Sequence, residues 1–139
     1  MQEIHIEQIR PDLTWRIRHE VMYPDLPFDV IKLANDDEGI HFGLFADNKL
    51  TSVVSLFNKG NIYQFRKFAT LAESQGKGYG SLLLDHIINY VRTFGAVKLW
   101  CNARVSAIPF YNKFGFIQTD QFSTNNGIDF VIMALELNN

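Results

Sequence analysis

The sequence has one cysteine, Cys101, among its 139 residues, which excludes an internal disulfide bond. It has no apolar run near the roughly 18 to 20 residues that a membrane-spanning helix needs. The segment MQEIHIEQIR at the N-terminus lacks the basic start and the apolar run of a secretion signal. These absences predict a protein of the reducing cytoplasm with no membrane partner.

An excess of charge of either sign is missing as well. The 13 Lys and Arg residues are balanced by 15 Asp and Glu residues, for a formal net charge of -2. Such a balance creates no long-range attraction to nucleic acid, so none is expected as a partner. The histidines, His5, His19, His41 and His86, form neither an HExxH motif nor a set with cysteines, so no metal is expected.

Apolar residues, in contrast, make up 47% of the sequence, which suffices for one hydrophobic core. We therefore expect residues 1–139 to form a single domain. Period-two alternation and buried apolar runs predict strands at residues 3–9, 62–72, 96–103, 116–122 and 128–137. Two more strands are predicted within residues 39–57, one before and one after Asp47-Asn48.

Helical patterns lie between these strands. The first covers residues 13–22 and is followed by a broken helical region around Pro24 and Pro27. A long helix of about four turns ends at Gly95, and a short one covers residues 105–115. The predicted fold is α+β, an α/β/α sandwich around a mixed, mostly antiparallel twisted sheet of about six to seven strands with about four helices.

A glycine turn opens the long helix in the segment ESQGKGYGSLLLDHIINYV, residues 73–91. Glycine lets a backbone approach a ligand closely, and the first turn of a helix presents unpaired N–H groups at its positive end. Such a turn suits a diphosphate-like group. The candidate binding residues are Gln75, Gly76, Lys77, Gly78, Tyr79, Gly80 and Ser81. A glycine-rich helix entry without a ligand is the alternative.

Two familiar phosphate motifs do not fit this turn. A P-loop requires Lys and then Ser or Thr directly after its last glycine, whereas Tyr79 follows Gly78. The dinucleotide motif GxGxxG requires its third glycine three residues after the second, whereas Gly80 lies two residues after Gly78.

A second segment, LWCNARVSAIPFYNKFGF at residues 99–116, completes a pattern in which the chain resembles the GNAT superfamily of acyl-CoA-dependent N-acyltransferases. The residues that match its two motifs are Gln75, Gly78 and Gly80 in the first, and Asn102, Ala107, Phe110, Tyr111, Lys113, Gly115 and Phe116 in the second. The order of the predicted elements also agrees, so the resemblance covers nearly the whole chain.

The resemblance implies acetyl-CoA as cofactor and a splayed central pair of strands. It implies that the main chain of Phe68, Ala69 and Thr70 binds the pantetheine arm, and that Asn102 binds pantetheine or holds the strands apart. It also implies that Tyr111 is the general acid toward the CoA thiolate. The alternatives are a plain central strand, a strand-end cap at Asn102 and an aromatic packing role for Tyr111.

The sequence does not identify which group acts as the general base. Histone-modifying relatives have a glutamate where Gln64 stands here, and an amide cannot accept a proton. Glu73, His41 or a water-mediated route are the remaining candidates, although a strand histidine is more often half-exposed packing. Cys101, in an apolar strand, is expected to be a small core residue without a role as nucleophile.

Other side chains could meet the acceptor. Arg16, Arg18 and Arg66 could bind an acidic substrate or be solvated, and Asp129 could bind a cationic amine. The aromatic residues Trp15, Tyr23 and Phe28 could line an apolar pocket or pack in the core.

The predicted function is direct transfer of an acetyl group from acetyl-CoA to a primary amine of a small molecule or peptide. A non-catalytic acyl-CoA-binding regulatory domain is the alternative that the Gln64 departure supports. The sequence determines neither the acyl-chain selectivity nor whether the protein forms a homodimer.

Overall fold

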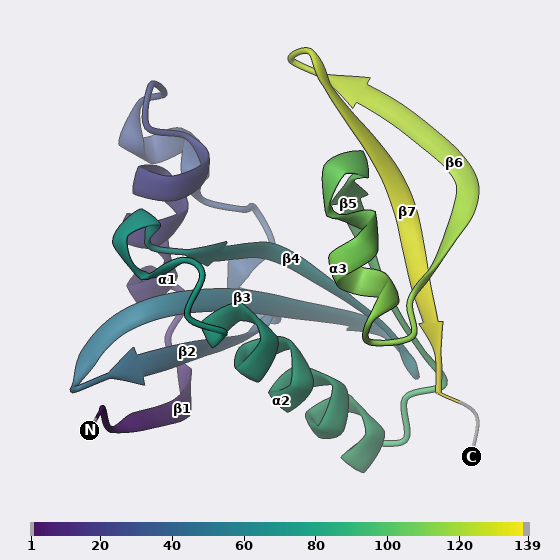
Figure 1. Cartoon of the computed structure of the whole chain (residues 1–139), viewed down its shortest axis with the longest axis horizontal. Helices are drawn as coiled ribbons and strands as arrows, with labels where there is room; N and C mark the ends of the chain where they lie inside the picture. The colour runs from purple at the N-terminus through teal and green to yellow at the C-terminus, as the bar shows by residue number, and fades with distance from the viewer. Residues whose placement is uncertain (1, 138–139) are drawn as a thin grey trace. The chain divides into compact units, whose positions relative to one another are not determined.

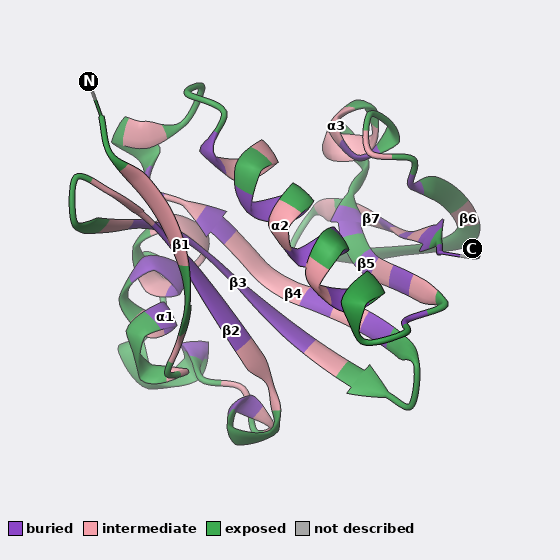
Figure 2. Cartoon of the chain, turned by 90° about the horizontal axis from the view of Figure 1, so that it is seen from below, coloured by how far each residue is buried: buried purple, intermediate pink, exposed green. Residues whose placement is uncertain are grey.

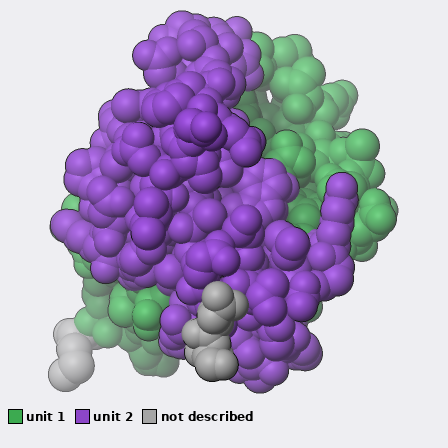
Figure 3. Space-filling view, turned by 90° about the vertical axis from the view of Figure 1, so that its right-hand side faces the viewer, with its two compact units in different colours: residues 1–57, 66–87 green, residues 58–65, 88–139 purple. Residues whose placement is uncertain are grey.

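The computed structural model describes residues 2–137. They form two compact units: one contains the chain up to Phe57 together with Arg66–Ile87, and the other contains Asn58–Phe65 with the chain from Ile88 onward (Figure 3). No helix in the described part of the chain is long and apolar enough to cross a membrane.

Seven strands hydrogen-bond in the order β1-β2-β3-β4-β5-β7-β6 (Figure 1). They are β1 (Ile4–Ile9), β2 (Ile40–Ala46), β3 (Lys49–Lys59), β4 (Ile62–Thr70), β5 (Lys98–Arg104), β6 (Ile117–Asn125) and β7 (Ile128–Glu136). Each predicted strand is present, and the mixed, mostly antiparallel sheet is confirmed. β4 and β5 run parallel, and Ile62–Gln64 pair with Lys98–Trp100.

The helical segments are α1 (Asp12–Ile17), the π-helix η1 (Arg18–Met22), the 3-10 helices η2 (Phe28–Ile31), η3 (Asp36–Glu38), η4 (Ala72–Ser74) and η5 (Val105–Ala107), α2 (Tyr79–Thr93) and α3 (Ile108–Asn112). The predicted broken helical region is therefore a π-helix followed by two short 3-10 turns.

Tight turns set the hairpin registers. Asp47 and Asn48 have φ of 50° and 68°, and Asn126 and Gly127 have φ of 52° and 77°, which is the conformation of a two-residue hairpin turn. The second turn is shorter than the STNNG segment suggests, because β6 continues to Asn125.

In the first unit, helices α1 and α2 pack on opposite faces of β2 and β3. Ile17 of α1 shares a buried cluster with Val53, whereas His86 of α2 makes an edge-to-face ring contact with Phe42 at 5.2 Å. Phe42 pairs with Val54, and successive strand residues face opposite ways, so Val53 and Val54 mark the two faces. Figure 2 shows α2 buried along one side and exposed along the other, as an amphipathic helix should be.

In the second unit, β7 lies between β5 and β6, and each pairing is antiparallel. Helix α2 ends here in a Schellman motif, in which the amide of Ala96 donates to the carbonyl of Val91 (3.0 Å) and the amide of Gly95 to that of Arg92 (3.0 Å). Gly95 has φ of 77°, so the predicted helix end at this glycine is confirmed.

Candidate active site

The loop between β4 and α2 is held by hydrogen bonds to the strands beside it. The amide of Leu71 donates to the carbonyl of Thr51 (3.0 Å), and the side-chain amide of Gln75 donates to the carbonyl of Thr70 (2.9 Å). The conformation of the segment before the glycine turn is therefore fixed by the first unit.

Two glycines of the turn adopt the left-handed conformation. Gly76 has φ of 82° and Gly78 has φ of 83°, and a Cβ built on either would meet no atom within 4 Å. This conformation favours glycine over most other residues, and the space beside both residues is open. Gly80 differs, because its Cβ would lie 3.4 Å from the ring of Phe68, so it permits close packing of α2 on β4.

The backbone beyond the turn supplies hydrogen-bond donors. The carbonyl of Gly78 accepts the first helical hydrogen bond, from Leu82 (3.1 Å), so the amides of Tyr79, Gly80 and Ser81 lie in the first turn of α2 and have no acceptor within the helix. Lys77 is exposed beside them. Free amides, the positive end of a 15-residue helix and a lysine suit a diphosphate.

The end of β4, where the resemblance implies that the pantetheine arm binds, is anchored to β3. Ser52 donates its hydroxyl to the carbonyl of Ala69 (3.1 Å), and its oxygen lies 2.8 Å from the hydroxyl oxygen of Thr70. Ala69 is buried, while Phe68 and Thr70 are half-buried. Their role in binding a cofactor stays a prediction.

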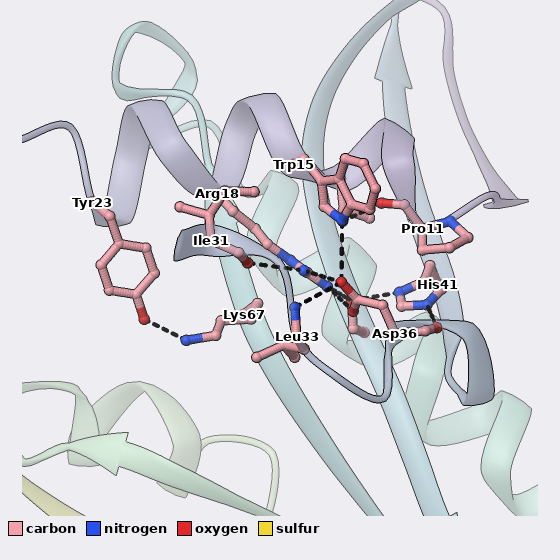
Figure 4. A network of polar contacts seen from close by, with 11 residues as sticks. Pro11, Trp15, Arg18, Tyr23, Ile31, Leu33, Asp36, His41 and Lys67 are labelled. Atoms are coloured by element: carbon pink, nitrogen blue, oxygen red, sulfur yellow. Dashed lines mark hydrogen bonds and ion pairs between the residues drawn. The ribbon is translucent and has the colours of Figure 1, made fainter. Parts of the chain in front are cut away.

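Lys67, just before these residues, has φ of 56° within β4. This left-handed conformation costs a residue other than glycine about 1 to 2 kcal/mol. The ammonium group of Lys67 donates a hydrogen bond to the hydroxyl of Tyr23 and lies 4.6 Å from the centre of its ring (Figure 4). This pair was not predicted, because neither a left-handed residue nor a contact between residues 44 positions apart leaves a local pattern in the sequence.

Tyr111, in the second unit, lies on α3 in an aromatic cluster. Its ring centre is 5.8 Å from that of Phe65, 5.1 Å from that of Phe110 and 5.8 Å from that of Phe116. Burial raises the pKa of the Tyr111 phenol above its ordinary value of 10, with a smaller contribution from Cys101. The phenol is therefore a proton or hydrogen-bond donor at neutral pH.

Cys101, also in the second unit, is buried in β5, as predicted for a core residue. Burial raises the pKa of its thiol from 9.0 to about 12. Since the thiolate is the reactive form, this thiol is inert at neutral pH.

The other predicted residues of the second unit are placed as follows. Gln64 is half-buried in β4 opposite Trp100, and Asn102 is exposed in β5 opposite Ile132. Asp129 is exposed, and its carboxylate accepts a hydrogen bond from the hydroxyl of Thr124 (2.8 Å).

Arg18 is neither at a substrate surface nor solvated, and the prediction for it is wrong. Its side chain is 0% exposed and forms a two-pronged ion pair with Asp36, at 2.8 Å and 2.9 Å (Figure 4). The helical face turned inward consists of Thr14, Ile17 and Arg18, at spacings of three and four residues, whereas Leu13 is 40% exposed.

His41 belongs to the same buried network and is not the half-exposed strand residue that the sequence suggested. Its Nδ1 lies 2.7 Å from the hydroxyl oxygen of Ser55, and its Nε2 lies 2.8 Å from the carbonyl oxygen of Asp36. Ser55 in turn accepts a hydrogen bond from Arg18 (2.8 Å). With both ring nitrogens engaged and 1% exposure, His41 holds structure together.

The network perturbs two pKa values. Burial tends to raise the pKa of Asp36, but hydrogen bonds from Arg18, Leu33 and Trp15 and the charge of Arg18 outweigh it, so this pKa is lowered from 3.8. Burial lowers the pKa of His41 from 6.5, and the hydrogen bond to the carbonyl of Asp36 offsets only part of this effect.

Acidification is therefore expected to weaken the fold in two stages. Below pH 6.5, His41 is protonated in the unfolded chain but stays neutral in the folded chain, because its pKa is lowered there. The free energy of unfolding therefore falls by up to about 1.4 kcal/mol per pH unit, until His41 is protonated in the folded chain as well. Below 3.8 the loss of the Asp36 charge adds a second decrease. Urea unfolding at pH 7.5, 6.5 and 5.5 measures the first stage.

A His41→Gln variant should show a smaller slope over this range, because it removes the group whose pKa differs between the folded and unfolded chains. An unchanged slope in His41→Gln would contradict the assignment.

The remaining candidates of the first unit lie at or near its surface. Arg66 is half-buried in β4, Glu73 is exposed in η4, and Arg16 is exposed and lies 3.5 Å from Glu20. Trp15 is half-buried, and its indole nitrogen donates to Asp36 (3.1 Å).

Comparison with known proteins finds matches to acetyltransferases. The family described as "Acetyltransferase (GNAT) domain" matches residues 17–137. An uncharacterized N-acetyltransferase of Bacillus subtilis, YitI, is 28% identical over 122 residues, 81% of this chain and 82% of that protein. The ribosomal protein bS18-alanine N-acetyltransferase of Salmonella typhimurium is 31% identical over 115 residues, 77% of this chain and 70% of that protein.

Among solved structures, a GNAT family acetyltransferase from Elizabethkingia anophelis with acetyl-CoA bound has a TM-score of 0.76 at 18% identity, over 98% of each chain. This likeness confirms the predicted fold class.

Proposed function

Because the chain belongs to the GNAT acetyltransferase family and is thus an acyl-CoA-dependent acyltransferase, we propose that it transfers an acetyl group from acetyl-CoA to a primary amine of a small molecule or peptide. GNAT acetyltransferases use acetyl-CoA, and the Elizabethkingia structure holds that molecule. The observation that carries the proposal is the open, left-handed glycine pair Gly76 and Gly78 in front of α2.

The residues of the turn fit the diphosphate of this donor. We assign its binding to the amides from Gly76 to Ser81, with Lys77 adding charge and Gln75 fixing the turn against Thr70. The main chain of Phe68 to Thr70 is proposed to bind the pantetheine arm. Acetyl-CoA, when bound, supplies an acetyl group activated as a thioester.

Tyr111 is proposed to donate to the departing sulfur. Burial keeps its phenol protonated, but the raised pKa also makes it a weaker acid than a free phenol. A thiol has an ordinary pKa of about 8.5, so complete transfer of the phenol proton is uphill, and a hydrogen bond from the O–H group is the larger part of the effect.

A Tyr111→Phe variant is expected to lower kcat about 10- to 100-fold, at or below the low end of the range for a general acid. The affinity for acetyl-CoA should stay within about tenfold, because one neutral hydrogen bond is worth about 0.5 to 1.5 kcal/mol. Steady-state kinetics and titration calorimetry measure the two quantities.

Tyr63→Phe provides the matched control, since Tyr63 is another buried tyrosine of the second unit. It should leave kcat unchanged. Equal losses in both variants would show that Tyr111 acts only through packing.

The acceptor is proposed to be an α-amino group. Gln64 cannot accept a proton, and the ring nitrogens of His41 are engaged, so neither supports deprotonation of a lysine amine. An amine of pKa about 10.4 needs roughly 4 to 5 kcal/mol to reach its free form at pH 7, against about 1 to 1.5 for an α-amino group of pKa about 8. The Salmonella relative, named for an alanine substrate, agrees with this choice.

Titration with acetyl-CoA and desulfo-CoA, followed by thiol release against a panel of amines, tests the proposal. Buried Cys101 will not add to the thiol signal of the native protein. Binding with amine-dependent release is the expected result, and binding without release on any amine would support the regulatory alternative instead. The proposal also takes residues 1–139 as one catalytic domain that works in the cytoplasm.

A further inference from the structure

Lys67 holds a positive charge in a half-buried place without an acidic partner. Within residues 2–137, no Asp or Glu forms an ion pair with its ammonium group, although six such pairs occur elsewhere. Its described contacts are the hydroxyl group and the ring face of Tyr23, both uncharged. A partly desolvated ammonium of this kind gains most from a carboxylate, which supplies the missing charge and accepts its N–H groups.

The backbone at Lys67 is shaped to present this charge. A left-handed residue inside a strand is strained unless it is glycine, and such strain gathers at functional sites. Tyr23, which receives the ammonium, directly follows the π-helix η1, and π-helical turns also occur frequently at functional sites. Two unusual backbone conformations thus meet at one pair of side chains, in the same unit (Figure 4).

The pair is next to the proposed position of the acetyl donor. Lys67 directly precedes Phe68, and consecutive Cα atoms are about 3.8 Å apart, so chain connectivity alone makes them neighbours. An acceptor whose amine is at the donor therefore has its other groups close to Lys67.

Exposed apolar side chains follow Tyr23 in the chain. The amide of Leu26 donates to the carbonyl of Tyr23 (3.1 Å), and Leu26, Phe28 and Val30 are 46%, 44% and 57% exposed. Exposed apolar groups in the segment that follows Tyr23 suit an acceptor with an apolar part in addition to a carboxylate.

We propose that Lys67 and Tyr23 form a carboxylate-binding subsite, so that the acceptor is an amine that also carries a carboxylate, as a free amino acid does. This inference rests on the proposed function and narrows its acceptor. Lys67 is then a specificity-determining residue: its ammonium binds the carboxylate, and Tyr23 holds the ammonium in place.

Binding of the reaction products provides the test, because it does not depend on turnover. N-acetyl derivatives of glycine, alanine, leucine and phenylalanine, each as the free acid and as the uncharged amide, are titrated into the protein with CoA present. We expect the acid of at least one pair to bind about 10- to 100-fold more tightly than its amide.

Three variants locate the preference. Lys67→Asn removes the charge while tolerating the left-handed backbone, and it should reduce the acid-to-amide ratio to about 1, mainly through weaker binding of the acid. Lys67→Arg should keep most of the ratio. Tyr23→Phe, which removes the hydroxyl that orients the ammonium, should reduce the ratio partly. Equal binding of acid and amide in every pair, or a ratio that survives in Lys67→Asn, would overturn the inference.

Thiol release with the corresponding free amino acids, amino acid amides and N-terminal peptides, measured on the same samples, separates this inference from the proposed function. Transfer to amides or peptides without any preference for the acid would refute the subsite alone. Preferential binding of acids without transfer to any amine would refute the transferase and leave the subsite intact.

Discussion

Replacing Arg18 with methionine is expected to lower the free energy of unfolding by about 3 to 5 kcal/mol, which corresponds to a decrease in Tm of about 10 to 20 °C for a chain of this size. Methionine retains most of the volume, so the loss comes from the charge that remains. Asp36 would keep its bonds from Leu33 (3.0 Å) and Trp15 (3.1 Å) but would lie buried without a cation. Urea unfolding with the linear extrapolation gives the difference.

The chain offers a closely matched control for this experiment. Arg16 lies two residues earlier and forms an ion pair with Glu20, but its side chain is 65% exposed. Arg16→Met should change the free energy of unfolding by less than about 0.5 kcal/mol, the ordinary contribution of an exposed helix pair.

A double variant separates the buried charge from general packing damage. Arg18→Met with Asp36→Asn removes both charges while the asparagine carbonyl can still accept hydrogen bonds, so it should be more stable than Arg18→Met alone. If the double variant is less stable than the single one, the uncompensated carboxylate is not the cause of the loss.

Replacing Gly78 with aspartate is expected to weaken acetyl-CoA binding about 100-fold or more, with the fold intact. A carboxylate beside a bound diphosphate repels it, and two unit charges 4 Å apart interact by about 4 kcal/mol at an effective dielectric constant of 20. The same carboxylate lies at the start of α2, where a negative charge favours the helix by about 0.3 to 1 kcal/mol. Opposite effects on binding and on stability are thus expected from one substitution.

Asparagine at the same position distinguishes charge from shape. Asn and Asp both tolerate the left-handed conformation, here a φ of 83°. Gly78→Asn should therefore weaken binding much less than Gly78→Asp. Gly95→Asp, at the other end of α2 with a φ of 77°, should leave binding unchanged. Equal losses for Asn and Asp would attribute the effect to shape, and wild-type affinity in Gly78→Asp would place the diphosphate elsewhere.

The features that the sequence predicted well depend on neighbours in the chain. Alternation identifies β1, the Asp47-Asn48 turn identifies the β2–β3 hairpin, and Gly95 identifies the end of α2. Two short motifs, around Gly78 and Tyr111, were enough for the family.

The features that it missed depend on contacts between distant residues. Arg18 is a surface residue by type, and only Asp36, 18 positions later, makes its burial favourable. A helical face of Leu13, Ile17 and Val21 also looks better than the observed face, because it contains no charge. Lys67 looks like an ordinary strand residue, since no residue next to it in the sequence indicates a left-handed backbone.

The two compact units have a consequence for how the protein can be divided. The chain passes from one unit to the other after Phe57, after Phe65 and after Ile87. No single cut in the chain therefore separates the two units, because Asn58–Phe65 of the second unit lies between the two segments of the first. During synthesis, all residues of the first unit have been made once Ile87 has been added, whereas Asn58–Phe65 must await the last strand of the second. A chain that ends near residue 87 thus contains the complete first unit, and it also carries Asn58–Phe65 without the strand β5 that pairs with it, a segment exposed to association with other chains.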